Sequence, residues 1–286
     1  MNIPVLDGVT ARTIATDRLT TRVLFTGPDD GIPVLFVHGN FSNATWWEET
    51  MVALPPRYRG IAADQRGYGG ADPGVLIDAT RGMGDFVDDA LALMDHLGHD
   101  RFHLVGNSLG GLVVWWMMAD APGRLLSVTL AGPGSPFGFG GTRDAIGTPT
   151  TTDFAGSGGG LINPDLIRSL LDGDRDSISD FSPRGIMRRL VWGEGLIPER
   201  EDALIDAMFR VHIGDRQLPA RDLSSGSFEN GKLVLEFRGM GGGEDARLEA
   251  SVKGDTMTGK VSMGRMGDQE ITATRTSKEA SKAPSA

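Results

Sequence analysis

A serine flanked by glycines is the feature of this sequence that most directly predicts chemistry. The segment Gly106-Asn107-Ser108-Leu109-Gly110 fits the pattern G-x-S-x-G. Small residues on both sides allow the backbone to bend sharply from a strand into a helix, so that the serine hydroxyl projects from the sheet. At such a bend the N–H of Leu109 and the positive end of the helix can stabilise a developing oxyanion. We therefore predict that Ser108 is a nucleophile.

A second segment with a predicted role lies earlier in the chain. His38-Gly39-Asn40 directly follows the apolar residues 32–37. The backbone N–H just after His-Gly is expected to be the second oxyanion donor, so that Asn40 (or Phe41) and Leu109 would form the hole. His38 itself is expected to brace this loop.

Asp64 begins a glycine-rich loop, Asp64-Gln65-Arg66-Gly67-Tyr68-Gly69. A carboxylate at the start of such a loop accepts hydrogen bonds from backbone N–H groups and so holds the turn in place. We expect Asp64 to stabilise the loop rather than to take part in catalysis.

The elements that must position these residues follow from the apolar pattern. Residues 32–37 are continuously apolar, which indicates a strand buried on both faces, as in a parallel sheet covered by helices. Residues 80–97 carry apolar side chains at steps of three and four, which predicts a helix that ends at Gly98. Strands alternating with helices predict a mainly parallel α/β sheet. The other predicted elements are two strands within 11–26, strands at 61–63, 102–105 and 126–131, and helices at 43–54 and 112–119.

The chain changes character twice after the predicted core, residues 1–131. Residues 132–222 begin with a Gly-, Thr- and Ser-rich stretch and continue with several short helices, which predicts a cap or lid. In residues 223–275 apolar and polar side chains alternate, which predicts a meander of four antiparallel strands with one wet face. Residues 276–286 are expected to be a disordered tail.

In this order, the motifs resemble the α/β-hydrolase superfamily. Strand-His-Gly-Asn, Asp-x-Arg-Gly-x-Gly and Gly-Asn-Ser-Leu-Gly-Gly carry the resemblance, which extends over about residues 10–220. Phe137–Arg143 and Asp153–Gly160 look like the cap of a bacterial branch of that superfamily. Asn107 resembles the carbon–carbon bond hydrolases of aromatic degradation. His38-Gly39-Asn40 resembles the dehalogenases, but these and the epoxide hydrolases use an aspartate nucleophile, whereas this chain has Ser108.

The chain departs from that superfamily at its general base. A serine hydrolase needs a base to take the serine proton and an acid to orient that base, and in this fold both follow the serine. Only His212 does so, either as an ordinary residue at the end of a cap helix stopped by Gly214 or as an unusual cap-borne base. Glu244 and Asp245 are expected to be solvated turn residues. The other histidines, His38, His96, His99 and His103, precede Ser108.

The acid-bearing strand and histidine loop of the superfamily are thus replaced here by the predicted meander. That meander resembles β-repeat segments near the ends of some bacterial amidohydrolase-related proteins, and no chemistry is visible in it. The fold class predicted from the sequence is therefore α/β: a hydrolase-like, mainly parallel sheet ending after six strands, a helical cap and an antiparallel meander.

Composition narrows the function further. The 286 residues carry a net charge of −10, which argues against nucleic acid or an anionic membrane as partner. The absence of cysteine excludes thiolate chemistry and cysteine-ligated metals. No apolar stretch approaches the ~20 residues that span a bilayer, and no secretory signal pattern opens the chain. We expect a cytoplasmic protein without metal or cofactor.

Three hypotheses follow. In the first, the protein is a cofactor-free hydrolase of small ester-like substrates: Ser108 attacks, Asn40 and Leu109 hold the oxyanion, and the base is His212, comes from a partner chain or is missing. In the second, it is a catalytically impaired remnant that binds ligands without turnover. In the third, the edge strands of the meander drive oligomerisation.

Overall fold

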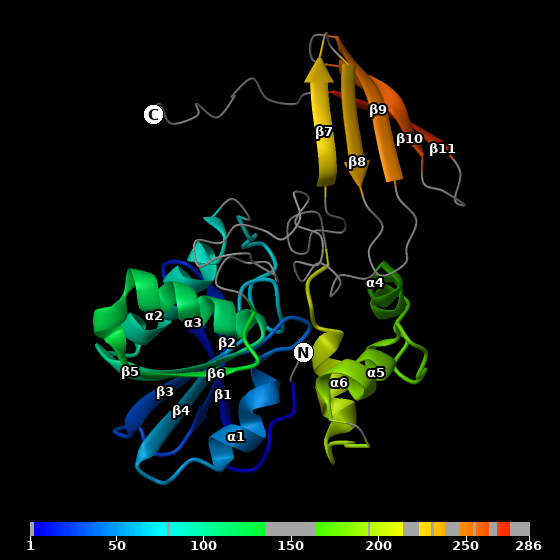
Figure 1. Cartoon of the computed structure of the whole chain (residues 1–286). Helices are drawn as coiled ribbons and strands as arrows, with labels where there is room; N and C mark the ends of the chain where they lie inside the picture. Colours follow the sequence, from blue (N-terminus) through cyan, green and yellow to red (C-terminus); the bar gives the residue numbers. More distant parts are fainter. Residues whose placement is uncertain are drawn as a thin grey trace.

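The computed structural model of the chain contains two separate sheets with helices around the first (Figure 1). It describes residues 3–78, 81–134, 164–193 and 195–213, together with five strands between residues 223 and 274. Several predictions concern residues outside these ranges. They are the cap motifs Phe137–Arg143 and Asp153–Gly160, the helix stop Gly214, the turn residues Glu244 and Asp245, and the tail 276–286.

The first sheet has six strands in the order β1-β2-β4-β3-β5-β6. β1 and β2 form an antiparallel pair, β2 is antiparallel to β4, and the remaining pairs are parallel. The mainly parallel α/β sheet expected from the sequence is therefore confirmed. The strands are β1 (Thr10–Ala15), β2 (Thr20–Thr26), β3 (Ile32–Val37), β4 (Tyr58–Ala63), β5 (Phe102–Asn107) and β6 (Leu125–Ala131).

Helices cover both faces of this sheet. The α2 and α3 helices lie on one face and α1 on the other (Figure 1). Because side chains alternate along a strand, Leu35 and Val37 of β3 join the larger apolar cluster, while Val34 and Phe36 join the smaller cluster, which includes Met51 of α1. Both faces of β3 are therefore dry, which explains its continuous apolar sequence. The helices are α1 (Glu48–Val52), preceded by a 3-10 turn (Ala44–Trp47), α2 (Gly84–His96) and α3 (Leu109–Asp120).

Three short helices pack beside the sheet: α4 (Pro164–Leu171), α5 (Pro183–Ile186), which runs into a π-helical turn (Met187–Val191), and α6 (Glu201–Met208). The Trp46 indole N–H donates to the Leu204 carbonyl of α6 at 3.2 Å. Arg200 forms a 2.8 Å ion pair with Glu48, whose side chain is fully buried. These contacts join this helical segment to the start of α1. No described helix is long and apolar enough to cross a membrane.

The second sheet is an antiparallel meander in the order β11-β10-β9-β8-β7. The prediction of four strands was wrong by one. The missed strand is β7, whose sequence LSSGSFE lacks the apolar alternation of the other four because serine and glycine fill its centre. The strands of the second sheet are β7 (Leu223–Glu229), β8 (Lys232–Phe237), β9 (Ala246–Lys253), β10 (Thr256–Ser262) and β11 (Asp268–Thr274).

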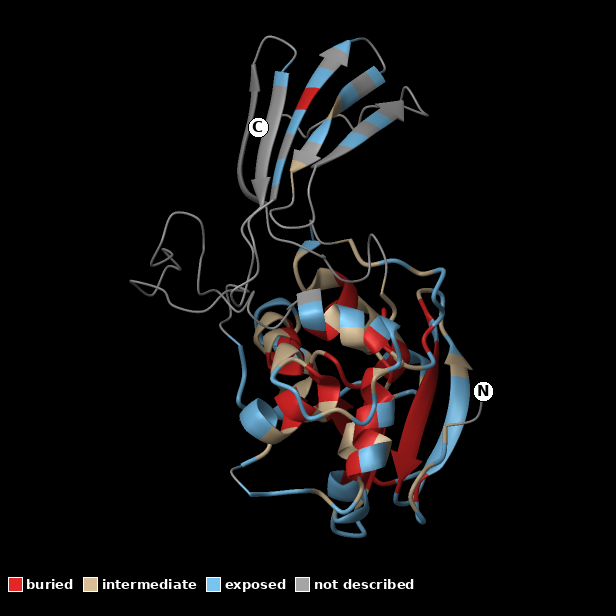
Figure 2. Ribbon diagram, turned by 90° about the vertical axis from the view of Figure 1, so that its right-hand side faces the viewer, coloured by how far each residue is buried: buried red, intermediate tan, exposed pale blue. Residues whose placement is uncertain are grey.

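A buried ion pair joins the loops at the end of the first sheet where β4 finishes. The Asp64 carboxylate accepts from Arg22 Nε at 2.9 Å, from the Ala44 N–H at 2.9 Å and from the Gly70 N–H at 2.7 Å. A Cβ at Gly69 would lie 2.3 Å from this carboxylate. Asp64 therefore holds its loop through backbone hydrogen bonds, as the sequence predicts. Figure 2 shows such buried residues in red, within a shell of exposed positions.

We expect Asp64→Asn to lower the free energy of unfolding by about 3–5 kcal/mol, because Arg22 would remain as a buried, uncompensated charge. Asp29→Asn is the matched control, since Asp29 also pairs with an arginine (Arg59, 2.6 Å) but is 82% exposed; it should cost less than about 1 kcal/mol. Urea denaturation measures both. Equal losses for the two variants would contradict the role assigned to Asp64.

Candidate active site

Ser108 lies at the bend between β5 and α3, with backbone angles that L-residues rarely adopt. Its φ is +51° and its ψ is −118°. Its N–H donates to the Ala131 carbonyl at 3.2 Å, and its own carbonyl accepts from Gly111 at 2.9 Å and Gly134 at 3.3 Å. Backbone strain of this kind costs about 1–3 kcal/mol and persists only where the surroundings impose it. The end of β6 and the start of α3 supply that constraint.

The flanking glycines are required by close backbone packing. A Cβ at Gly106 would lie 2.4 Å from the Gly110 carbonyl oxygen, and a Cβ at Gly110 would lie 2.2 Å from the Val37 carbonyl oxygen. A Cβ at Gly39 would lie 3.1 Å from the Cβ of Ser108. The absence of side chains at these three positions thus lets the end of β3 lie directly against the serine.

The Asn40 side chain organises the loop after β3. Its Oδ1 accepts from the Phe41 N–H at 2.9 Å and from the Tyr68 hydroxyl at 2.8 Å. Phe41 also has a positive φ of +49°. The Phe41 N–H is therefore already bonded, whereas no acceptor for the Asn40 N–H is found among the described residues. Of the two N–H groups that the sequence predicts as alternative oxyanion donors, only that of Asn40 has no acceptor among the described residues.

His38 braces two loops, as the sequence predicts. Its Nδ1 lies 2.8 Å from the Gly39 carbonyl, which can only accept, so Nδ1 carries the proton and Nε2 accepts from the Gln65 N–H at 3.0 Å. The Gln65 side chain donates back to the His38 carbonyl at 2.7 Å. Complete burial lowers the pKa of His38 from 6.5 to about 4. His38 is therefore neutral, and both ring nitrogens are engaged.

His212 lies beyond α6 rather than at the end of a helix, so that part of the prediction was wrong. The α6 helix ends at Met208, and the following residues extend towards the loop after β4. The His212 N–H donates to the Gly67 carbonyl at 2.8 Å, and Nε2 lies 3.3 Å from the Gly69 carbonyl. Because a carbonyl only accepts, Nε2 carries the proton. Nδ1 keeps its lone pair and is buried without a hydrogen-bond partner in the described chain.

Tyr68 connects His212 to the loop beside the serine. It forms a β-bridge with Val211 and donates its hydroxyl to Asn40. The structure thus packs Gly39, which precedes Asn40, against Ser108, whereas His212 bonds to Gly67 and Gly69 in the loop after β4. No hydrogen bond joins Ser108 to a histidine in the described part of the chain.

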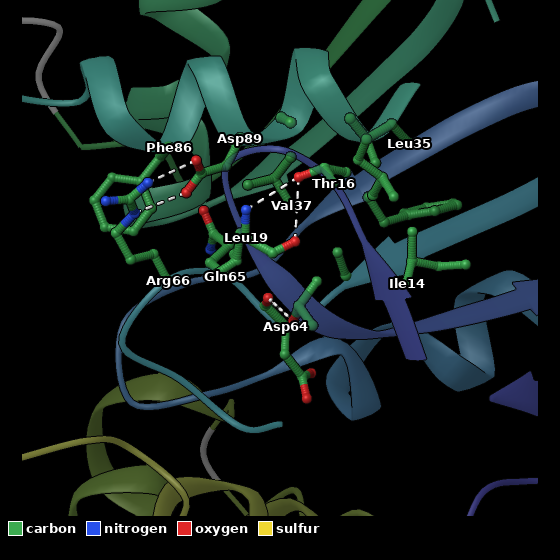
Figure 3. A pocket seen from close by; sticks show the side chains of 15 residues that line it. Ile14, Thr16, Leu19, Leu35, Val37, Asp64, Gln65, Arg66, Phe86 and Asp89 are labelled. Atoms are coloured by element: carbon green, nitrogen blue, oxygen red, sulfur yellow. Dashed lines mark hydrogen bonds and ion pairs between the residues drawn. The ribbon is translucent and has the colours of Figure 1, made fainter. Parts of the chain in front are cut away.

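A cavity beneath α2 is not part of this site. It has a volume of about 40 Å³ and is lined mainly by apolar residues, including Leu35, Val37 and Phe86. The Arg66 guanidinium at its rim faces Asp89, which it contacts at 2.7 and 2.8 Å (Figure 3). A cavity of this size has room for very few water molecules and not for a metabolite. Nor do three His, Asp or Glu residues among those described gather as a metal site.

The sequence of this chain is similar to a family model and to several known proteins. Residues 32–156 match the family model described as alpha/beta hydrolase fold. The dihydrolipoyllysine-residue acetyltransferase component of an acetoin cleaving system from Cupriavidus necator is 28% identical over 248 residues, which are 83% of this chain and 59% of that protein. A Variovorax paradoxus protein named as a carbamate hydrolase is 39% identical over 105 residues, 36% of this chain and 39% of its own length.

A third relative is the 3-oxoadipate enol-lactonase 1 of Acinetobacter baylyi. It is 29% identical over 112 residues, which are 39% of this chain and 41% of the lactonase. The chain therefore spans less than two thirds of the length of each of these relatives.

Gly110→Ala should destabilise the protein by about 1–3 kcal/mol, because the new methyl group would push α3 away from the Val37 carbonyl. An ordinary helical Gly→Ala change would instead stabilise by up to about 1 kcal/mol, so the sign of the effect is diagnostic. Gly123→Ala is the control, since a Cβ there meets nothing within 4 Å. Urea denaturation compares them, and a stabilised Gly110→Ala variant would refute the packing argument.

Replacement of His38 by glutamine should make the free energy of unfolding less dependent on pH under acidic conditions. Between pH 6.5 and about 4, the unfolded chain binds a proton that folded His38 excludes, so the free energy of unfolding falls as the pH drops through this window. The wild type should lose on the order of 3 kcal/mol more than His38→Gln across it. Denaturant titrations at several pH values measure the difference, with exposed His96→Gln as control. Parallel profiles for wild type and His38→Gln would contradict the buried neutral state.

Proposed function

The chain belongs to the α/β-hydrolase superfamily, and on that premise we propose that it is a cofactor-free hydrolase of small ester-like substrates: carboxylic esters, lactones or related carbonyl compounds. Ser108 attacks the carbonyl carbon, and the backbone N–H groups of Asn40 and Leu109 bind the oxygen on which negative charge develops. The observation that carries this proposal is the strained bend, φ +51°, that presents Ser108 beside Gly39. Strain in a position so tightly fixed is typical of reacting residues.

The electrostatics at the bend support the proposed oxyanion hole. Leu109 is the first residue of the α3 helix, whose opening N–H groups have no partner within the helix. The helix dipole adds positive potential at the same point. Asn40 follows Gly39, which lies against Ser108, and the hydrogen bonds that the Asn40 side chain accepts from Phe41 and Tyr68 hold the loop that carries it. One donor in such a hole contributes about 10²–10³-fold to kcat.

His212 is the proposed base. Its Nδ1 keeps a lone pair that no described residue bonds to, and its neighbour Val211 pairs with Tyr68, which contacts Asn40. In the proposed reaction Nδ1 takes the Ser108 proton as Oγ bonds to the carbonyl carbon, and returns it to the leaving oxygen as the C–O bond breaks. Water then attacks the acyl-serine in the same way, which releases the carboxylic acid and restores Ser108.

The names of two relatives, an enol-lactonase and a carbamate hydrolase, agree with hydrolysis at an acyl carbon. One observation favours a second candidate, a catalytically impaired protein that binds ligands without turnover. It is the lack of a hydrogen bond from Ser108 to any histidine within the described residues. The hydrolase proposal also has a second form, in which a partner chain supplies the base instead of His212.

Steady-state hydrolysis of p-nitrophenyl acetate separates these candidates. The hydrolase proposal predicts turnover that falls at least about a hundredfold in Ser108→Ala, because the covalent step is lost. Ser179→Ala, which alters an exposed serine, is the matched control and should keep the wild-type rate. Equal rates for wild type and Ser108→Ala would exclude the hydrolase proposal and favour the protein that binds ligands without turnover.

The same assay identifies the base. His212→Gln should lower kcat about 10²–10⁴-fold if His212 takes the serine proton. A fluorophosphonate probe provides a second readout, since only an activated serine reacts with it. Wild type should label at Ser108 and His212→Gln should label much more slowly. Undiminished labelling in His212→Gln would exclude His212 and place the base on a partner chain.

A further inference from the structure

The outer edge of β6 lacks the charged side chains and proline that normally prevent an edge strand from pairing with another chain. β6 pairs with β5 on one side, and no described strand pairs with its other side. Its sequence LLSVTLA contains no charge, no proline and no glycine, and Leu126 is 41% exposed. The backbone N–H and C=O groups along such an edge form a ready template for another strand. This edge is therefore suited to pairing with a further strand.

The opposite edge of the same sheet provides a contrast within the molecule. It is formed by β1, with the sequence TARTIA, and the exposed Arg12 lies near its centre. A charged side chain on an edge strand discourages pairing with another chain. Within the described part of the chain, only the β6 edge is thus left open to a partner strand.

The β6 sequence is nearly palindromic, which identifies the partner. In an antiparallel pair centred on Val128, that residue lies opposite the partner's Val128, and Leu126 lies opposite the partner's Leu130. Ser127 lies opposite the partner's Thr129. Apolar residues thus meet apolar residues and hydroxyls meet hydroxyls, and each such cross-strand pair contributes about 0.2–1 kcal/mol. We propose that β6 binds β6 of a second copy of this chain about a two-fold axis, which continues the sheet from one subunit into the other.

Charge and packing around β6 are compatible with this dimer. Two chains of net charge −10 repel each other overall, so contact is favoured where the surface is neutral, as it is along β6. Arg124, which precedes the strand, is held by Asp95 of its own chain at 2.6 Å. The two-fold axis also places both α3 helices on the same face of the joined sheet. α3 is apolar almost throughout, and Met118 near its end is 37% exposed, so this neighbour would bury more apolar surface.

The absence of cysteine from the chain makes the register directly testable. In the proposed pair the Cα atoms of the two Val128 residues lie about 4.5–5.5 Å apart, within the ~4.4–6.8 Å range of disulfides. Val128→Cys should therefore form a covalent dimer on mild oxidation. Thr129→Cys is the register control, because its two copies are offset by about two residues along the strands, beyond disulfide reach. Thr13→Cys on the exposed β1 edge is the second control.

The proposal predicts that the wild type sediments at twice the chain mass at micromolar concentration. Leu126→Lys should sediment at the chain mass, since it places a charge in the pairing edge. Val128→Cys should cross-link at least tenfold faster than Thr129→Cys or Thr13→Cys. A wild type that sediments as a monomer would overturn the proposal. So would a dimer that leaves Val128→Cys uncross-linked, because the second sheet or another surface would then hold it together.

Discussion

The structure depends on the close approach of two backbones, at the point where the Val37 carbonyl meets Gly110. A Cβ on residue 110 would lie 2.2 Å from that oxygen. Because a glycine stands there, the first turn of α3 can rest on the end of β3 and the chain between β5 and α3 must turn within a single residue. Ser108 takes the strained angles that this turn requires. The position of its side chain is thus decided by backbone packing rather than by its own contacts.

Around this contact, buried polar groups hold the loops that follow β3 and β4. His38 is neutral and joins the Gly39 carbonyl to the Gln65 N–H, so it links one loop to the next. Asp64 gathers Arg22 and the N–H groups of Ala44 and Gly70. Each of these side chains is fully buried, so an unpaired polar atom there would be costly. These buried hydrogen bonds therefore hold the loops beside Ser108 in place, although the Ser108 side chain itself makes no hydrogen bond to another described residue.

The sequence predicts the parts of this arrangement that rest on local patterns. The run 32–37 indicates β3 because both of its faces are buried, and the glycines around Ser108 indicate the bend because only they permit close packing. The role of His38 also follows, since a histidine at a strand end with two loops nearby is most simply a brace. The strand β7 escaped prediction because serine and glycine give it no apolar period. The docking of His212 on Gly67 and Gly69 depends on tertiary contacts that no spacing in the sequence encodes.

The central claim is that Ser108 forms a covalent bond with its substrate, and mass spectrometry of the acid-quenched protein tests it most directly. After brief reaction with p-nitrophenyl acetate, the account predicts one added acetyl group per chain, on the peptide that contains Ser108. The adduct should decay on a time scale that matches turnover. An unmodified Ser108 peptide in protein that still hydrolyses the ester, or acetylation at another residue, would contradict the account.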